Sequence, residues 1–339
     1  MMLAHILKAL WNAASNPATS RLRSVGRPRL HRTGASAPTL QSRYATSRRA
    51  FLQAILATAG VAQTEMRAAQ RPSPRPASNA GGLIDVNVSL SQWPSRRLRG
   101  GDTAALAAML RRQGVVQAWA GSFDGLLHKD IASVNTRLAN ECRRHGRGLL
   151  VPFGSINPKL PDWPEDLRRC VEEHPMPGIR LHPNYHGYKL DDPDCVRLLR
   201  LATEHRLIVQ LALVMEDERM MHPNLRVDPV DTTPLADLVK QTPGLRLVLL
   251  NALRTLRGQP LLHLTGAGDV YVEISMLEGV GGVGNMLAQV PLNRVLFGSH
   301  APLFYFKSAL LKLKESVLSS EQFRAVRIEN ARRVFATRL

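Results

Sequence analysis

The sequence predicts an α/β protein whose main domain is a (β/α)8, TIM-like barrel. From residue 82 onward, eight short apolar runs alternate with segments of helical periodicity. The region from residue 80 to residue 339 also matches the roughly 250 residues that such a barrel needs. An open doubly wound sheet would place a glycine-rich phosphate loop after its first strand, and Ser89-Leu-Ser-Gln-Trp-Pro94 contains none.

Each predicted strand is a nearly continuous apolar run, as expected for parallel strands that are buried on both faces. In chain order the strands are expected at 83–88, 115–120, 149–155, 178–182, 207–213, 245–251, 270–275 and 294–298. Helices are expected between and after them, near 102–113, 129–145, 162–174, 192–205, 231–241, 258–266, 281–290, 305–317 and 320–336. Helix-opening patterns such as Asp162-Trp-Pro-Glu165 and Ser319–Gln322 support these starts.

Residues 1–79 are expected to lie outside the barrel, which then spans 80–339. The segment is rich in Arg, Ser, Ala and Pro, and Arg48-Arg49 precedes a short, uncharged, weakly apolar run. This layout is typical of a twin-arginine export signal, which predicts a periplasmic or extracellular protein. A mitochondrial-type transit peptide and an uncleaved tail are the alternatives, because residues 1–50 contain no acidic residue.

The charge distribution argues against nucleic acid as a partner. The chain carries a formal charge of +18, of which residues 1–79 hold +11, with Lys8 and eleven arginines against Glu65. The remaining charge is scattered as pairs such as Arg111-Arg112, and no basic stripe interleaved with aromatic residues appears. No apolar run reaches the roughly 20 residues of a spanning helix, so stable membrane insertion is not expected. The expected partners are a small-molecule substrate and, through the outer helices, a second copy of the chain.

The candidate site residues stand where the predicted strands end, because barrels build active sites at the carboxyl ends of their strands. The candidates are Asn87, Arg180, His182, Tyr185, His186, Gln210, Arg219, His222, Asn251, Glu273 and His300. Glu273 is predicted to be buried in mid-strand, where a carboxylate needs a partner. The segment 215–234, with three prolines and a charge cluster, is expected to cover the barrel mouth as a lid.

Four pieces of the sequence resemble the amidohydrolase-related branch of the metal-dependent hydrolase superfamily. They are Ile84-Asp-Val-Asn87, Gly178-Ile-Arg-Leu-His-Pro-Asn-Tyr-His186, Phe297-Gly-Ser-His-Ala-Pro302 and Ile328-Glu-Asn-Ala-Arg332. The resemblance covers roughly residues 82–338. It implies a TIM-like barrel that hydrolyses small organic substrates or, in some members, decarboxylates them.

The chain departs from this family at the expected metal ligands. The resemblance implies His-x-His at the end of the first strand, where this chain has Asn87 and Ser89. It also implies histidines where Gln210 and Asn251 stand, and an aspartate in place of His300. Because amide oxygens are weak zinc donors, no cofactor is predicted, and a zinc site is kept as the alternative.

Two hypotheses about the function follow from these substitutions. In the first, the barrel is a metal-independent hydrolase of a small carboxylate, ester or lactone, comparable to the pyrone-dicarboxylate lactonases of the same superfamily. His300 is then the general base, His182 and Glu273 complete the catalytic set, and the other candidates bind substrate. In the second, the barrel has lost catalysis and binds a small ligand. A metal-dependent hydrolase or decarboxylase with a rearranged site remains a further alternative.

Overall fold

A computed structural model describes residues 81–336 of the 339-residue chain. The segment 1–79, with the proposed export signal at Arg48-Arg49, lies outside the described residues. The structure therefore bears on the predicted barrel alone.

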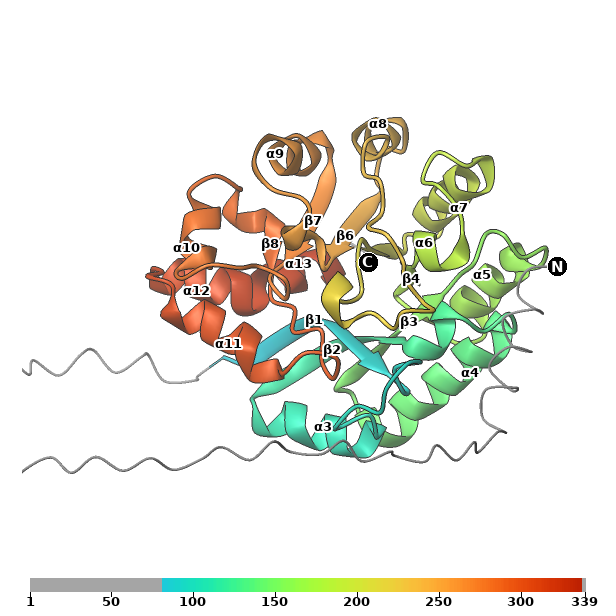
Figure 1. The fold of residues 1–339 in the computed structure, drawn as a ribbon, viewed down its shortest axis with the longest axis horizontal. Coiled ribbons are helices and arrows are strands. Elements are labelled where there is room, and N and C mark those ends of the chain that lie inside the picture. Colours follow the sequence, from blue (N-terminus) through green and yellow to red (C-terminus); the bar gives the residue numbers. More distant parts are fainter. Residues whose placement is uncertain (1–80, 337–339) are drawn as a thin grey trace, which may run out of the picture. The chain divides into compact units, whose positions relative to one another are not determined.

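Eight parallel strands form one sheet in sequential order, which confirms the predicted barrel (Figure 1). Their bounds are β1 Leu83–Leu90, β2 Val115–Ser122, β3 Leu150–Ser155, β4 Gly178–Leu181, β5 Ile208–Ala212, β6 Arg246–Leu250, β7 Asp269–Glu273 and β8 Val295–Leu296. All eight fall where the apolar runs placed them. Parallel neighbours in sequential order require a crossover after every strand, and the predicted helices supply these crossovers.

The barrel closes between β1 and the residues that follow the short strand β8. Val86 donates its backbone N–H to the Phe297 carbonyl at 3.0 Å, and His300 donates to the Asn87 carbonyl at 2.8 Å. Val88 also forms a parallel bridge with Ala301. This closure holds the motif around Ser299 and His300 directly against the carboxyl end of β1.

The helices surround the strands in Figure 1. Their bounds are α3 Thr103–Arg112, α4 Ile131–Glu141, α5 Trp163–Glu172, α6 Pro183–His186, α7 Pro193–Glu204, α8 Leu235–Gln241, α9 Gly258–Ala267, α10 Gly282–Leu287, α11 Phe306–Glu315, α12 Ser320–Arg324 and α13 Asn330–Ala336. Side-chain caps fix several starts: Asp102 accepts from the Ala105 N–H at 2.8 Å, and Ser319 with Gln322 forms a complete capping box.

Two helical segments differ from the expected continuous helices. A π-helical turn, η2 Cys142–Gly146, ends the segment predicted at 129–145, and another, η6 Ala325–Glu329, separates α12 from α13. The short helix α6 was not predicted. It follows β4 directly and holds Tyr185 and His186 beside the barrel mouth.

Apolar side chains pack in two clusters. The larger one lies between the strands and the outer helices. The second joins Trp119, Phe153 and Ile208 to Ile328 and Val334 of the C-terminal helical segment. Arg246, the first residue of β6, donates to the Val334 carbonyl at 3.0 Å, so this segment covers the amino ends of the strands. The carboxyl ends of the strands instead carry buried polar residues. None of the described helices is long and apolar enough to cross a membrane.

Candidate active site

A layer of buried polar side chains fills the carboxyl end of the barrel. None of its members is more than 2 % exposed: Asp85, Asn87, Ser89, Arg180, His182, Gln210, Asn251, Glu273, Ser275, Ser299 and His300. Burying a polar group costs free energy unless it is hydrogen-bonded, so the partners of each side chain decide what it can still do.

Glu273 lies at the centre of one hydrogen-bonded group. Its Oε1 accepts from the Asn251 N–H at 2.6 Å, from Ser275 Oγ at 2.7 Å and from Asn87 Nδ2 at 3.2 Å. Its Oε2 accepts from the Ser275 N–H at 2.6 Å. A Cβ atom on Gly298 would lie 2.4 Å from the same Oε2, so the glycine of the Phe-Gly-Ser motif leaves room for this carboxylate. The predicted need of Glu273 for partners is met within the barrel wall.

Asp85 is held by the segment after β8. Ser299 Oγ lies 2.5 Å from its Oδ2, and the N–H groups of Ser299 and Asn87 donate to Oδ1 at 3.0 and 3.1 Å. Burial raises the pKa of the Asp85 carboxyl from 3.8 to about 7, against the opposing effect of these hydrogen bonds. Asp85 therefore connects β1 to the residues that follow β8 through hydrogen bonds.

Arg180 is expected to bind substrate, but most of its donors are used by the barrel itself. Nε donates to Gln210 Oε1 at 2.8 Å, Nη1 to Val88 O and Ser89 Oγ at 3.0 Å, and Nη2 to Trp119 O at 3.2 Å. Burial lowers the pKa of Arg180 to about 9, although Asp85 and Glu273 act the other way. Gln210 completes the group by donating to the Val86 carbonyl at 2.7 Å.

One ring nitrogen of His300 is hydrogen-bonded, and the other has no hydrogen-bond partner among the described residues. Its Nε2 lies 2.7 Å from the carbonyl oxygen of Met215, and because a carbonyl only accepts, Nε2 carries the proton. Nδ1 is buried without a hydrogen-bond partner among the described residues. Burial lowers the pKa of His300 from 6.5 to about 4, so the ring is neutral at physiological pH. The backbone of His300 is left-handed, with φ of 58°, a conformation that few residues other than glycine adopt.

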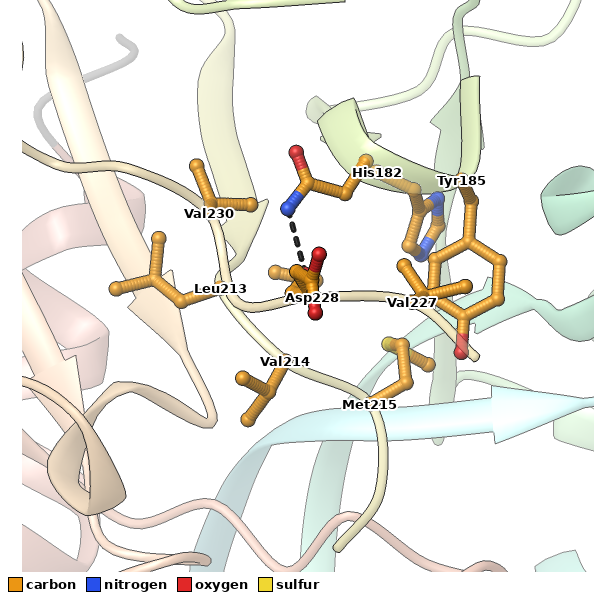
Figure 2. A pocket seen from close by; sticks show the side chains of 10 residues that line it. His182, Tyr185, Leu213, Val214, Met215, Val227, Asp228 and Val230 are labelled. Carbon is orange, nitrogen blue, oxygen red and sulfur yellow. Dashed lines mark hydrogen bonds between the residues drawn. The ribbon is translucent and has the colours of Figure 1, made fainter. Parts of the chain in front are cut away.

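His182 follows β4, and its Nδ1, like that of His186, is also buried without a hydrogen-bond partner among residues 81–336. Its pKa lies well below 6.5 because it is buried and because His186, Arg180 and His300 are close enough to disfavour a further positive charge. The side chains of Tyr185, Met215 and Val227 surround it in a small pocket (Figure 2). The cavity there, about 10 Å³, holds about one water molecule.

The structure gathers some of the other predicted residues around His182 and leaves two apart. His186 packs edge-on against His182, with ring centroids 6.0 Å apart, and its Nε2 bonds the Gly125 carbonyl at 2.8 Å. Arg219, with a side chain 79 % exposed, pairs with Asp217 at 2.6 Å. The exposed His222 accepts from the Asn224 N–H through Nδ1 at 3.2 Å. Neither of the last two reaches the buried polar layer.

The segment from Leu213 to Val230, here called the mouth segment, covers the polar layer. Val230 N–H donates to the Leu213 carbonyl at 2.9 Å, and the buried carboxylate of Glu216 pairs with Arg96 at 2.6 Å. Arg254 pairs with Asp217. These contacts, together with the bond from Met215 to His300, hold the segment over the predicted catalytic residues.

Sequence reasoning missed Ser275 and the contact between Asp85 and Ser299. Ser275 stands two positions after Glu273, so the alternation of strand side chains was the available signal for it. No local signal pairs Ser299 with Asp85, which lies 214 positions earlier.

Comparison with models of known protein families identifies the family of this chain. A family model described as "Amidohydrolase" matches residues 4–337. The chain belongs to this family. The resemblance expected from the strand-end motifs is therefore confirmed. A search among proteins of curated function finds no match.

Solved structures of the same fold include several decarboxylases, all at low sequence identity. A 2,6-dihydroxybenzoate decarboxylase from Rhizobium is 13 % identical, with a TM-score of 0.55 over 76 % of this chain and 99 % of its own. A 5-carboxyvanillate decarboxylase from Novosphingobium aromaticivorans, solved with manganese, is 13 % identical, with a TM-score of 0.54 over 77 % and 99 %. A dihydroxybenzoic acid decarboxylase from Polaromonas, also with manganese, is 13 % identical, with a TM-score of 0.55 over 76 % and 98 %. At this identity the likeness establishes the fold.

The residues at the barrel mouth do not fit a divalent metal such as the manganese that two of these structures hold. Within 81–336, no three His, Cys, Asp or Glu side chains are grouped so that they could hold an ion. Glu273 and Asp85 direct their oxygens at N–H and O–H donors of the barrel wall, and His300 Nε2 is bonded to Met215. A metal at this place would have to break several of these hydrogen bonds, so no catalytic step is assigned to one.

Proposed function

We propose that this member of the amidohydrolase family is a metal-independent hydrolase of a small organic ester or lactone that carries a carboxylate. The observation that carries the proposal is the state of His300. Its protonated Nε2 is fixed by Met215, which leaves the lone pair of Nδ1 as a buried acceptor without a partner in the part of the chain that the structure describes. An imidazole held in one tautomer is the arrangement that a general base needs.

In the proposed reaction, Nδ1 of His300 takes a proton from a water molecule while the water oxygen attacks the substrate carbonyl carbon. Collapse of the tetrahedral intermediate breaks the carbon–oxygen bond of the ester or lactone. The imidazolium then returns its proton to the leaving oxygen, so a lactone yields one hydroxy acid. His182 lies close enough to His300 for their charges to interact, and its buried Nδ1 has no hydrogen-bond partner among the described residues, so we assign it to positioning that water.

Substrate access requires movement of the mouth segment, because His300 is fully buried. The segment carries the carbonyl of Met215 that closes over the imidazole. Opening would expose the base, and reclosure would exclude bulk water, as lids do in many enzymes. The predicted lid thus becomes part of the proposed cycle.

The test is turnover of a panel of small lactones and esters, with and without a carboxylate, by the full chain in the presence of a chelator. Activity that survives chelation and falls only below about pH 5 is expected, because the pKa of His300 is about 4. An acid limb near the ordinary imidazole value of about 6.5 would argue against His300 as the base. Activity that tracks a bound metal, measured by elemental analysis, would favour the metal-dependent alternative.

A non-catalytic barrel that binds a small ligand is the second candidate, and the use of the polar side chains within the barrel wall favours it. Every carboxylate oxygen of Asp85 and Glu273 accepts at least one hydrogen bond from the barrel wall. Such a protein would show ligand binding without turnover across the whole panel.

A further inference from the structure

A second and much larger cavity opens beside the barrel mouth. It has a volume of about 430 Å³ and lies between the residues that follow β7 and helix α11. This volume falls within the range of small-molecule sites, roughly 300–1,000 Å³. The cavity is separate from the small pocket around His182, with which it shares no lining residue.

Lys312 of α11 is the cation that distinguishes this cavity. Its ammonium donates one hydrogen bond, to the backbone carbonyl of Ser275. No carboxylate of the described residues lies within ion-pair distance of it. Because an ammonium has three donors, two remain for a ligand. Partial burial lowers the pKa of Lys312, although the charges of Glu273, Glu278 and Glu315 act the other way. The ammonium is therefore a partly dehydrated positive charge, which an anion in the cavity would stabilise.

The other charged groups of the cavity are mostly neutralised by their own partners. Asp217 is paired with Arg254 and Arg219. Glu278 is paired with Arg257 at 3.0 Å. Glu315 is exposed at the rim. Among the charged groups of the cavity, the partly buried ammonium of Lys312 is therefore the one that an added anionic ligand would stabilise most.

The rest of the wall suits an apolar group. Phe304, Met276 and Leu277 line the cavity next to Lys312. Phe304 also packs edge-on against His300, with ring centroids 5.1 Å apart. A ligand with an anionic head and a short hydrocarbon or aromatic tail would pair with the lysine and cover these side chains.

We propose that this cavity binds a small organic carboxylate, with its carboxylate on Lys312 and its apolar tail against Phe304, Met276 and Leu277. The carboxylate would accept charge-assisted hydrogen bonds from the free donors of the ammonium. Binding at this site requires neither turnover nor the His300 base, so it is testable whether or not the chain is a hydrolase.

The probes are hexanoate and 3-phenylpropionate, with hexanamide, 3-phenylpropionamide and hexylamine as matched comparisons. Titration calorimetry with the full chain is expected to show binding of both acids and at least about tenfold weaker binding of the amides and the amine. Lys312→Met keeps the aliphatic stem and should weaken acid binding by at least about tenfold, and Lys312→Arg should retain most of it. Lys314→Met, two positions along the same helix and exposed, is the matched control and should bind as the unaltered chain does.

Thermal unfolding of each variant separates loss of the site from loss of the fold. Absence of acid binding up to millimolar concentration would overturn the assignment. Equal binding of acids and amides, preference for hexylamine, or equal losses in the Lys312→Met and Lys314→Met proteins would do the same.

Discussion

Nε2 of His300 and the carbonyl oxygen of Met215 lie 2.7 Å apart, although 85 positions separate them in the chain. This one contact has two consequences. It fixes the imidazole tautomer, which leaves Nδ1 as the basic nitrogen, and it holds the mouth segment over the polar layer. Variants that separate these two consequences can distinguish a catalytic histidine from a structural one.

Two substitutions of His300 make this separation. In His300→Gln, the amide nitrogen occupies about the place of Nε2 and can still donate to Met215, but no basic nitrogen remains. We expect thermal stability close to that of the unaltered chain and a loss of turnover of about 10²–10⁴-fold. His300→Asn suits the left-handed backbone but does not reach Met215, so its free energy of unfolding should fall by about 1–3 kcal/mol.

The measurements are lactone or ester turnover and the midpoint of thermal unfolding for both variants. Undiminished turnover in a stable His300→Gln protein would remove His300 from the mechanism. Equal destabilisation in both variants would show that the contact with Met215 is not preserved by the glutamine.

Asp85 and His300 give the stability of the fold opposite dependences on pH. The pKa of Asp85 rises from 3.8 to about 7 on folding, so between these values the folded state binds the extra proton and stability falls as pH rises. The pKa of His300 falls from 6.5 to about 4, so the unfolded state binds the extra proton and stability is lost as pH falls across that window. The two effects oppose each other between about pH 4 and 6.5.

Replacing Asp85 with asparagine should reveal this balance, because asparagine resembles the neutral carboxylic acid. The free energy of unfolding of Asp85→Asn, relative to the unaltered chain, should increase as pH rises from 4 to 7, by up to a few kcal/mol. Urea unfolding at several pH values measures the difference. Asp237→Asn, at a residue whose side chain is 74 % exposed on α8, should show no such trend. A pH-independent difference for Asp85→Asn would contradict the raised pKa.

The ion pair between Arg96 and Glu216 should control opening of the mouth segment. Arg96→Met leaves the Glu216 carboxylate, only 4 % exposed, without its cation, so the closed segment loses stability. Trypsin cleavage at Arg219 or Arg226, located by mass spectrometry, should accelerate by at least about tenfold, because such cleavage follows the open population. Arg257→Met breaks an ion pair in which both side chains are more than half exposed, and should leave this rate unchanged. Similar rates in both variants would show that the segment is held by other contacts.

The sequence was sufficient for the barrel because the information needed for it is local. Every strand is a short apolar run, and Asp102 and Ser319 mark helix starts through side-chain caps. The ends of elements were less accurate. The last strand shrinks to Val295–Leu296 because the residues after it bond β1 individually, outside a regular ladder.

The site was only partly predictable because its chemistry depends on contacts between distant residues. The strand-end rule identified His182, Glu273 and His300 as members of one layer. It could not show that the donors of Arg180 are used by Val88, Ser89 and Trp119, which lie 61–92 positions away. Arg180 was a candidate for binding substrate, and the structure instead shows a buried side chain whose hydrogen bonds connect β4 to β1, β2 and β5.

Because Arg180 is held in this way, the neighbouring Gly121 of β2 should not tolerate a larger side chain. A Cβ atom on Gly121 would lie 2.7 Å from Arg180 Nη1 and 2.8 Å from its Cδ. Because the hydrogen bonds of Arg180 hold the guanidinium in place, it cannot move aside without losing them. Gly121→Ala should therefore lower the free energy of unfolding by about 1–3 kcal/mol. Gly266→Ala, where a Cβ meets nothing within 4 Å on α9, should be neutral or raise it by up to about 1 kcal/mol. Denaturant unfolding compares the two, and a stable Gly121→Ala protein would mean that Arg180 is not fixed by its barrel partners.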